Sequence, residues 1–137
     1  MALYKTKTGI ISGSSYEEVR RCALAVYNNI RKRTKRKPYI RSAYFQRQKI
    51  FFDFFWIHLW QSGGYKERVR RLKYFQSAIE VLKHTRNEPI SKENPHRRSE
   101  ILHRFAGLTK NNQLFFVQVK EHKSSGRKYF MSCFPAK

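Results

Sequence analysis

Residues 101–135 read ILHRFAGLTKNNQLFFVQVKEHKSSGRKYFMSCFP, and this stretch decides the fold. Three runs within it, RFAGL, LFFVQVK and KYFMSCF, are rich in Phe, Val and Tyr, and the polar stretches TKNNQ and HKSSGR separate them. Short runs of this composition joined by polar turns are typical of antiparallel strands connected by hairpins. The segment therefore predicts an antiparallel meander of three to four strands over about residues 100–135.

Upstream of these strands, apolar residues recur at the spacing of helices. Ser15 and Glu18 have the spacing of a capping box, which predicts that a first helix starts at Tyr16. We expect a second helix, capped by Ser42, to contain the aromatic stretch IFFDFFWIHLW (50–60). That stretch is too short to cross a bilayer, so we expect the helix to be buried.

A third helix is expected over about residues 65–83, followed by a loop rich in Asn, Pro and Ser that leads into the strands. No linker or internal repeat divides the chain, so we expect residues 1–137 to form one domain with its helical part at about 15–84. Helices first and strands afterwards predict an α+β fold, with about three N-terminal helices followed by a three- to four-stranded antiparallel meander.

The charge balance narrows the functional classes. The chain of 137 residues carries 30 Lys and Arg against 9 Asp and Glu, for a formal net charge of +21, and Asp53 is its one aspartate. Metal-dependent phosphoryl-transfer enzymes need converging carboxylates, so this composition disfavours them. A hydrophobic content of 40% disfavours a disordered basic tail. The sequence therefore predicts a folded domain that binds a polyanion, with nucleic acid preferred to an anionic membrane.

Strand alternation predicts which side chains of the meander share a face. The face that mixes cations, an amide, a hydroxyl and rings is expected to hold Phe116, Gln118, Lys120, Lys128, Phe130, Ser132 and Phe134. Cations can contact phosphates while rings stack on bases, so we expect this face to bind nucleic acid. The alternative is an ordinary solvated face of an antiparallel sheet.

A second basic feature is the run RKRTKRKPYIR (31–41) after the first helix. It is either a docking patch for nucleic acid or a solvated connector, and the net charge favours docking. The residues expected to bind nucleic acid are Arg31, Lys32, Arg33, Lys35, Arg36, Lys37, Arg68, Arg71, Phe116, Gln118, Lys128 and Phe130.

The block 101–135, preceded by a helix and an NP-containing loop, resembles the small phage and mobile-element nucleases grouped with barnase, EndoU, colicin-type tRNases and RelE toxins, the BECR fold. The likeness is clearest over residues 78–135. It rests on a helix-then-meander order, a Lys within the middle strand and a Ser in a final strand ending S-x-F-P. The resemblance implies a metal-independent ribonuclease that uses the 2′-OH of the RNA as its nucleophile.

The resemblance also implies catalytic roles for a few residues. Lys120 and Arg104 would stabilise charge on the phosphate, and Ser132 would donate a hydrogen bond to it. His103 or His84 would be the titrating group, although on a regular strand His103 points away from Arg104. Neither a metal nor a cofactor is implied.

Other polar groups are expected to be structural. The five histidines and the two cysteines, Cys22 and Cys133, match no metal-ligand spacing. We expect His58 to be a hydrogen-bonded core residue and Asp53 to pair with an arginine of the third helix. Two lone thiols and no visible signal peptide predict a cytoplasmic protein.

The leading hypothesis is a small, basic, metal-independent endoribonuclease, with a toxin as one form, that cleaves RNA by attack of the 2′-OH on the adjacent phosphate. RNA, with tRNA as one candidate, is the expected substrate, and an acidic antitoxin or immunity protein is the expected partner of a toxin. The alternative is a non-catalytic RNA- or DNA-binding protein that uses the same basic and aromatic surface. No membrane association is expected.

Overall fold

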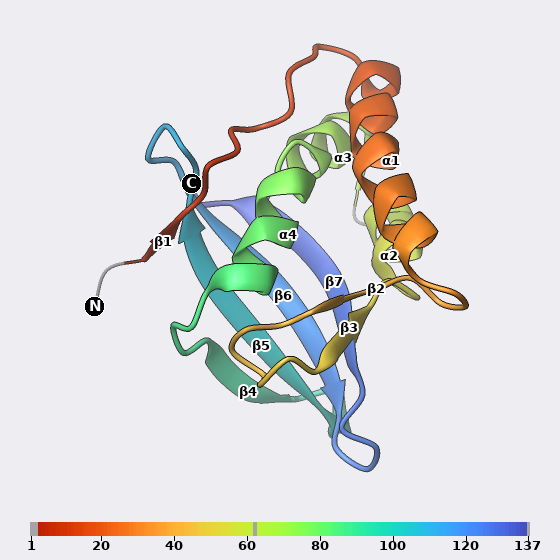
Figure 1. Cartoon of the computed structure of the whole chain (residues 1–137), viewed down its shortest axis with the longest axis vertical. Helices are drawn as coiled ribbons and strands as arrows, with labels where there is room; N and C mark the ends of the chain where they lie inside the picture. The colour runs from red at the N-terminus through yellow and green to blue at the C-terminus, as the bar shows by residue number, and fades with distance from the viewer. Residues whose placement is uncertain (1–2, 62, 137) are drawn as a thin grey trace.

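The structure is a computed structural model that describes residues 3–61 and 63–136. Within these ranges the chain forms four helices and seven strands (Figure 1). In chain order they are β1 (Tyr4–Lys5), α1 (Tyr16–Arg33), β2 (Tyr39–Arg41), β3 (Lys49–Phe51), α2 (Phe55–Gln61), α3 (Tyr65–Leu72), α4 (Phe75–His84), β4 (Ile90–Asn94), β5 (Arg97–Leu108), β6 (Leu114–His122) and β7 (Lys128–Pro135).

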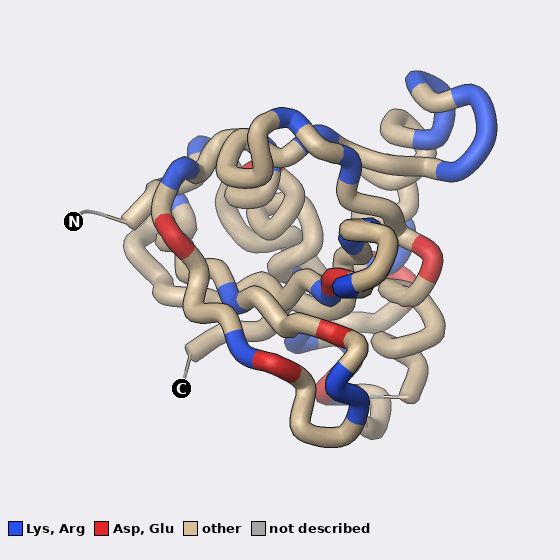
Figure 2. Tube along the Cα trace, turned by 90° about the horizontal axis from the view of Figure 1, so that it is seen from below, with Lys and Arg blue, Asp and Glu red and all other residues tan. Residues whose placement is uncertain are grey.

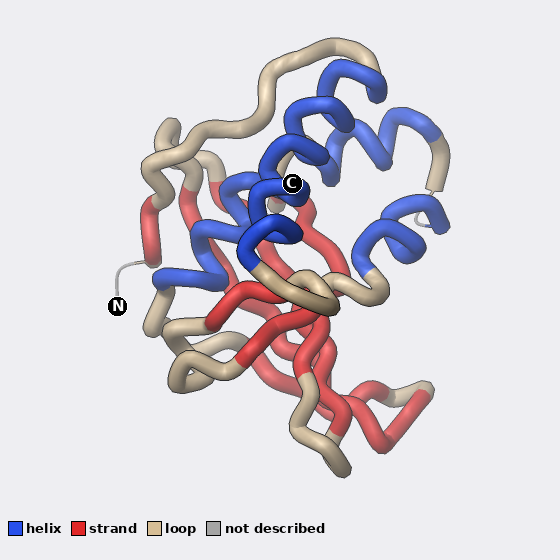
Figure 3. The backbone as a smooth tube through the Cα atoms, turned by 45° about the vertical axis from the view of Figure 1, so that its right-hand side comes forward, coloured by secondary structure: helices blue, strands red, loops and turns tan. Residues whose placement is uncertain are grey.

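The strands form one mixed sheet in the order β1-β5-β6-β7-β3-β2, and β4 also pairs with β5. Neighbours are antiparallel except for β1 with β5 and β3 with β7, which run parallel. The strands curl beneath the helices (Figure 3). The predicted fold class, helices followed by a short antiparallel meander, is therefore wrong, because β1, β2 and β3 precede or separate the helices and join the same sheet.

A β-hairpin and a short helix replace the predicted second helix. After β2 the chain turns where Ser42 Oγ accepts a hydrogen bond from the Phe45 amide at 3.1 Å, and Gln46 and Arg47 adopt φ values of 53° and 68°. Left-handed residues cannot continue a right-handed helix, so the chain reverses and β3 pairs back onto β2. Residues 55–60 of the aromatic stretch are helical, whereas residues 50 and 51 belong to β3. No helix in the described ranges has both the length and the apolar character to cross a membrane.

The predicted third helix is interrupted after Leu72, and the next helix begins at Phe75. At the break the Lys73 carbonyl accepts a hydrogen bond from the Ile11 amide at 2.9 Å, which fastens the N-terminal segment there. The break lets α4 lie along the sheet while α3 packs against α1 and β7. The loop predicted to follow contains β4, which pairs with β5.

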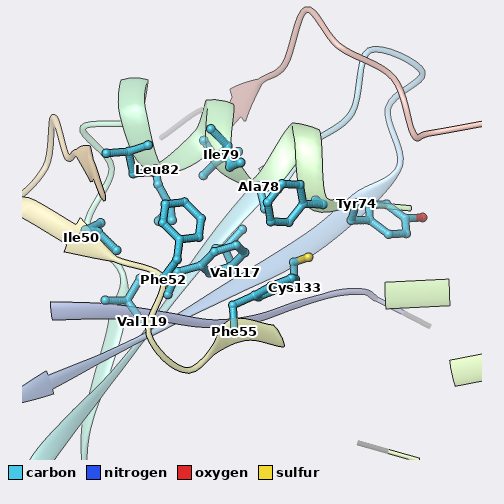
Figure 4. Close-up of a cluster of buried hydrophobic side chains, with 14 of the residues drawn as sticks. Ile50, Phe52, Phe55, Tyr74, Ala78, Ile79, Leu82, Val117, Val119 and Cys133 are labelled. Carbon is cyan, nitrogen blue, oxygen red and sulfur yellow. The ribbon is translucent and has the colours of Figure 1, made fainter. Parts of the chain in front are cut away.

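The hydrophobic core lies between α4 and one face of β5, β6 and β7. Figure 4 shows Ala78 and Leu82 of α4 above Val117 and Val119 of β6, and all four side chains are buried.

The capping box predicted at the start of α1 is present, because Ser15 Oγ accepts a hydrogen bond from the Glu18 amide at 3.2 Å. The face of the sheet turned away from α4 carries polar and aromatic side chains.

Candidate functional site

The face of β5, β6 and β7 turned away from α4 gathers polar and aromatic side chains from all three strands. The register places Arg104 opposite Gln118, and Gln118 opposite Ser132. Two residues before Gln118 on β6, Phe116 lies opposite Phe134 of β7. We call this surface the cationic face and define it by Arg104, Phe116, Gln118, Lys120, Ser132 and Phe134.

A β-bulge determines which side chains of β7 reach the cationic face. Gln118 pairs with Ser132 whereas the next residue, Val119, pairs with Phe130, so Met131 is the extra residue between them. An extra residue reverses the alternation of side chains on its far side. The N-terminal half of β7 therefore presents the opposite side chains from those that regular alternation predicts.

The prediction that Lys128 and Phe130 lie on this face is wrong because of the bulge. Phe130 is fully buried in the core, where its ring stacks on Phe55 with centroids 4.5 Å apart. Lys128 is buried on the same side of the sheet. Tyr129 takes their place and lies opposite Lys120.

Helices α2 and α3 bring further groups to the edge of the cationic face. The Arg71 guanidinium of α3 lies 5.5 Å from the ring centroid of Phe134. The Lys120 ammonium lies 4.1 Å from the ring centroid of Phe54, just before α2. His58 follows Phe54 by one helical turn, and its amide donates to the Phe54 carbonyl at 2.9 Å. The predicted binding residue Arg71 and the predicted catalytic residue Lys120 are thus brought together with a histidine.

His58 is a histidine at the edge of the cationic face whose pKa is shifted by its surroundings. Burial is the main cause that lowers the pKa of His58, and the positive charges of Arg71 and Lys120 lower it further. Because both charges act on the ring, His58 lies near Arg71 of α3 and Lys120 of β6. A lowered pKa keeps the imidazole neutral at neutral pH, the form that can accept a proton.

From its place in the aromatic stretch, His58 is expected to be a hydrogen-bonded core residue and not a functional one. The side chain is half-buried and faces the two cations. The available signal was the four-residue spacing between Phe54 and His58, which puts both on one side of a helical turn. That signal becomes informative only once α2 is known to pack against β7, and no local sequence pattern encodes that packing.

Lys120 is held in place by a buried carboxylate. Its ammonium lies 3.5 Å from Glu100 Oε2, and the Lys120 side chain is only 14% exposed. The same carboxylate oxygen lies 3.6 Å from Nε2 of His122, the next residue of β6 on this side of the sheet. Asn94 Nδ2 also donates to Glu100 at 3.1 Å, which fixes the carboxylate. Lys120 is therefore a positioned cation rather than a free surface lysine.

Arg104 and two rings form the other end of the cationic face. The Arg104 guanidinium lies 5.6 Å from the ring centroid of Phe116 and 5.3 Å from that of Phe134. The two ring centroids are 5.8 Å apart across β6 and β7, and both rings are half-buried. Two adjacent rings with an exposed guanidinium can stack nucleobases and contact a phosphate.

The two histidines that the resemblance implies as titrating groups, His103 and His84, do not lie beside Lys120. His103 is buried on the opposite face of β5, where Nδ1 lies 2.7 Å from Ser91 Oγ and Nε2 lies 2.8 Å from Glu121 Oε1. His84 ends α4, and its ring stacks on Tyr4 with centroids 6.1 Å apart. Both histidines therefore lie away from the cationic face, on the α4 side of the sheet.

The basic run lies at a different place from the cationic face. Its residues end α1, form the loop to β2 and include β2 itself. Figure 2 shows the dense group of Lys and Arg in this loop projecting from one side of the molecule. Lys37 forms an ion pair with Asp53 at 2.8 Å, so the predicted pairing of Asp53 with an arginine of the third helix is wrong. Arg68 lies over the Trp60 ring, 3.9 Å from its centroid.

In the described part of the chain, no three His, Cys, Asp or Glu side chains come close enough together to hold a metal ion. The cationic face instead presents three cations, Arg71, Arg104 and Lys120, beside the neutral imidazole of His58. Such a group can bind an anion and take up a proton at the same place.

Comparison of the chain with protein-family models, with curated proteins and with solved structures found no match. The cationic face and its chemistry are thus the basis on which a function can be proposed.

Proposed function

We propose that the protein is a metal-independent endoribonuclease and that the cationic face, with His58 and Arg71 at its edge, is the catalytic site. The observation that carries the proposal is the position of the half-buried His58 one helical turn after Phe54, whose ring centroid lies 4.1 Å from the Lys120 ammonium. Burial and the charges of Arg71 and Lys120 lower the pKa of this histidine. A neutral imidazole next to fixed cations is suited to remove a proton from a group that is about to attack a bound phosphate.

The proposed reaction starts with an RNA phosphate bound by Lys120, Arg71 and Arg104. His58 accepts the proton of the neighbouring 2′-OH, the 2′-oxygen attacks phosphorus, and the bond to the 5′-oxygen breaks. The cations stabilise the extra negative charge of the pentacoordinate transition state. We assign protonation of the departing 5′-oxygen to His122, which lies two residues beyond Lys120 on β6, where its Nε2 is 3.6 Å from Glu100 Oε2.

Two further features support RNA as the substrate. Phe116 and Phe134 offer rings on which the bases next to the scissile phosphate can stack. The exposed basic run at the end of α1 supplies charges that can contact a more distant part of the same strand. A single-stranded region of RNA, whose bases are free to stack, fits these features better than a duplex.

The test is cleavage of mixed RNA in the presence of EDTA, with analysis of the product ends. We expect 2′,3′-cyclic phosphate ends, and we expect His58→Ala to lower the rate by about 100-fold or more, as for removal of a general base. RNA binding, measured by mobility shift, should change by less than about threefold because the cations remain. His84→Ala, a histidine on the other side of the sheet, is the matched control and should cleave like the wild type.

A non-catalytic nucleic-acid-binding protein is the alternative outcome. It would retard intact RNA without producing cyclic ends, and His58→Ala would then have no effect on the RNA products. The variant Lys120→Ala also distinguishes a ribonuclease from a protein that only binds nucleic acid. Loss of cleavage with most binding retained supports the catalytic site, whereas parallel loss of both indicates only electrostatic contact.

A further inference from the structure

A groove lies between α1 and α2, and none of the residues that line it belongs to the cationic face. Its volume is about 1190 Å³. Helices α1 and α2 both pack against α3, which leaves the space between their exposed sides unfilled. The groove is lined by Leu24, Ala25 and Tyr27 of α1 and by Trp56, Ile57 and Trp60 of α2.

The floor of the groove is apolar and uncovered. Ile57 and Trp60 are each 60% exposed, and they are among the largest exposed apolar side chains of the described residues. Trp56 lies between them and Tyr27, with the rings of Trp56 and Tyr27 5.4 Å apart. An exposed apolar surface of this kind, gathered in a concave site, is typical of a docking site rather than of a free surface.

The rim of the groove is basic. Arg20 and Arg21 line it from α1, and the Arg68 guanidinium lies over the Trp60 ring, 3.9 Å from its centroid. Glu17, at one end, is the single acidic residue among those that line it. The groove thus combines an apolar floor with mainly positive edges.

We propose that this groove binds an acidic amphipathic helix of a partner protein. A helix laid between α1 and α2 would place its apolar face on Ile57 and Trp60 and its carboxylates beside Arg20, Arg21 and Arg68. The proposal is independent of the ribonuclease function, because the groove shares no residue with the cationic face.

Other occupants fit the groove less well. A second copy of this chain carries the same net charge of +21 and is repelled. An anionic membrane is flat and would contact protruding side chains rather than a concave floor. RNA fits less well although the groove holds aromatic rings, because Arg68 lies over the Trp60 ring and the rings of Tyr27 and Trp56 meet edge to face. The aliphatic surface of Leu24, Ala25 and Ile57 neither stacks on bases nor forms hydrogen bonds.

The two tryptophans of the chain, Trp56 and Trp60, both line the groove, so intrinsic tryptophan fluorescence reports on this site alone. The probe is a synthetic helical peptide of about 18 residues, with Leu along one face and Glu along the other, a length of about 27 Å. We expect a shift of the emission to shorter wavelength and a dissociation constant of about 10 μM or tighter. A peptide of the same composition in scrambled order should not bind.

Two substitutions of the same kind test the location. Ile57→Glu puts a carboxylate on the floor of the groove and should weaken binding of the acidic peptide by about tenfold or more. Ile90→Glu is the matched control, because Ile90 on β4 is 66% exposed and lies outside the groove, so binding should change by less than about twofold. Both positions are exposed, and thermal unfolding will confirm that both variants are folded.

Three results would overturn the proposal. One is equal binding of the ordered and scrambled peptides, and another is equal weakening by Ile57→Glu and Ile90→Glu. The third is a fluorescence change that a uridine dodecamer or phosphatidylserine vesicles produce and the peptide does not. In this outcome Ile57→Glu abolishes the change. That result would assign the groove to RNA or to a membrane surface.

Discussion

His103 Nε2 lies 2.8 Å from Glu121 Oε1 across the β5–β6 pair, on the side of the sheet that α4 covers. The same carboxylate group lies 3.9 Å from the buried Lys128 ammonium. Lys128 also donates to Gln48 Oε1 at 2.5 Å, and Gln48 precedes β3. One carboxylate thus neutralises a buried lysine and orients a buried histidine at the place where β7 meets the β2–β3 hairpin.

Loss of Glu121 should cost more stability than loss of Lys128. Glu121→Leu leaves the Lys128 ammonium and the His103 ring without their carboxylate, and we expect a loss of about 2–4 kcal/mol. Lys128→Met removes the buried charge, keeps a long apolar stem over the Phe45 ring and should cost less than about 1 kcal/mol. Urea unfolding measures both, and equal losses would contradict this account.

Gly107 of β5 is predicted to tolerate no side chain, because α4 lies directly against it. A Cβ atom there would lie 2.6 Å from Val81 Cγ2 and 3.3 Å from the Phe115 ring. Gly107→Ala should therefore destabilise the protein by about 1–3 kcal/mol. Gly9→Ala, where a Cβ meets nothing within 4 Å, is the control and should have little effect.

A double-mutant cycle tests the same contact. Val81→Ala removes the clashing methyl group and costs stability by itself through the cavity that it leaves. In the double variant the methyl group introduced by Gly107→Ala occupies part of that cavity, so the combined loss of unfolding free energy should be smaller than the sum of the single losses. Simple additivity would show that the clash is not with Val81.

The strands over residues 101–135 could be predicted because each is a local run with clear composition and turns. The partners of β5 and β7 outside that block could not. β1 and β3 contribute only short runs that pair in parallel with residues far along the chain, and no local pattern encodes such a pairing. The stretch at 50–60 is apolar throughout, and periodicity cannot distinguish a buried strand from a buried helix in such a run.

The cationic face was partly predictable for the same reason. Alternation along β6 places Gln118 and Lys120 on one side, and the structure has them there with Arg104. No pattern in the sequence indicates the bulge at Met131, so regular alternation predicts the wrong face for the side chains of β7 that precede it. His58 reaches the site through the packing of α2 and α3 beside β7, which follows from tertiary structure alone.

Glu80 of α4 should make part of the stability dependent on pH. Burial raises the pKa of Glu80, but hydrogen bonds from the amides of Lys7 and Thr8 and from the hydroxyls of Tyr4 and Thr8 outweigh it and hold the pKa below its usual value. A carboxyl whose pKa is depressed on folding stabilises the protein above its unfolded pKa, and this contribution is lost as the pH falls through the folded value.

Glu80→Gln is the corresponding variant. We expect it to lower the unfolding free energy by about 1–2 kcal/mol at pH 7, with the difference from the wild type shrinking as the pH falls below about 4.5. Glu88→Gln, at an exposed position after α4, is the control and should follow the wild type at every pH. A difference between Glu80→Gln and the wild type that stays constant down to pH 2 would exclude the role assigned to this carboxylate.

The basic run at the end of α1 should set the salt dependence of RNA binding. Replacing Arg33, Lys35 and Arg36 with Gln removes three exposed cations and should reduce the slope of log affinity against log salt by about 2 for single-stranded RNA. Replacing Lys92, Arg98 and Lys110, which are also exposed but lie elsewhere, changes the net charge equally. If both triple variants lose the same slope, the run is a solvated connector and not a docking site.

The charge environment of His58 gives a prediction that does not depend on activity. Burial and the charges of Arg71 and Lys120 lower its pKa below the usual 6.5, so Arg71→Gln should raise the pKa by removing one of the two cations. NMR titration of the His58 ring measures this change directly, and Arg33→Gln, at the exposed end of α1, should leave the pKa unchanged. If His58 is the general base, the acid limb of the pH–rate profile for RNA cleavage should move to higher pH by the same amount in Arg71→Gln. A shift seen by NMR without a matching shift of the limb would remove His58 from the mechanism while leaving its electrostatics intact.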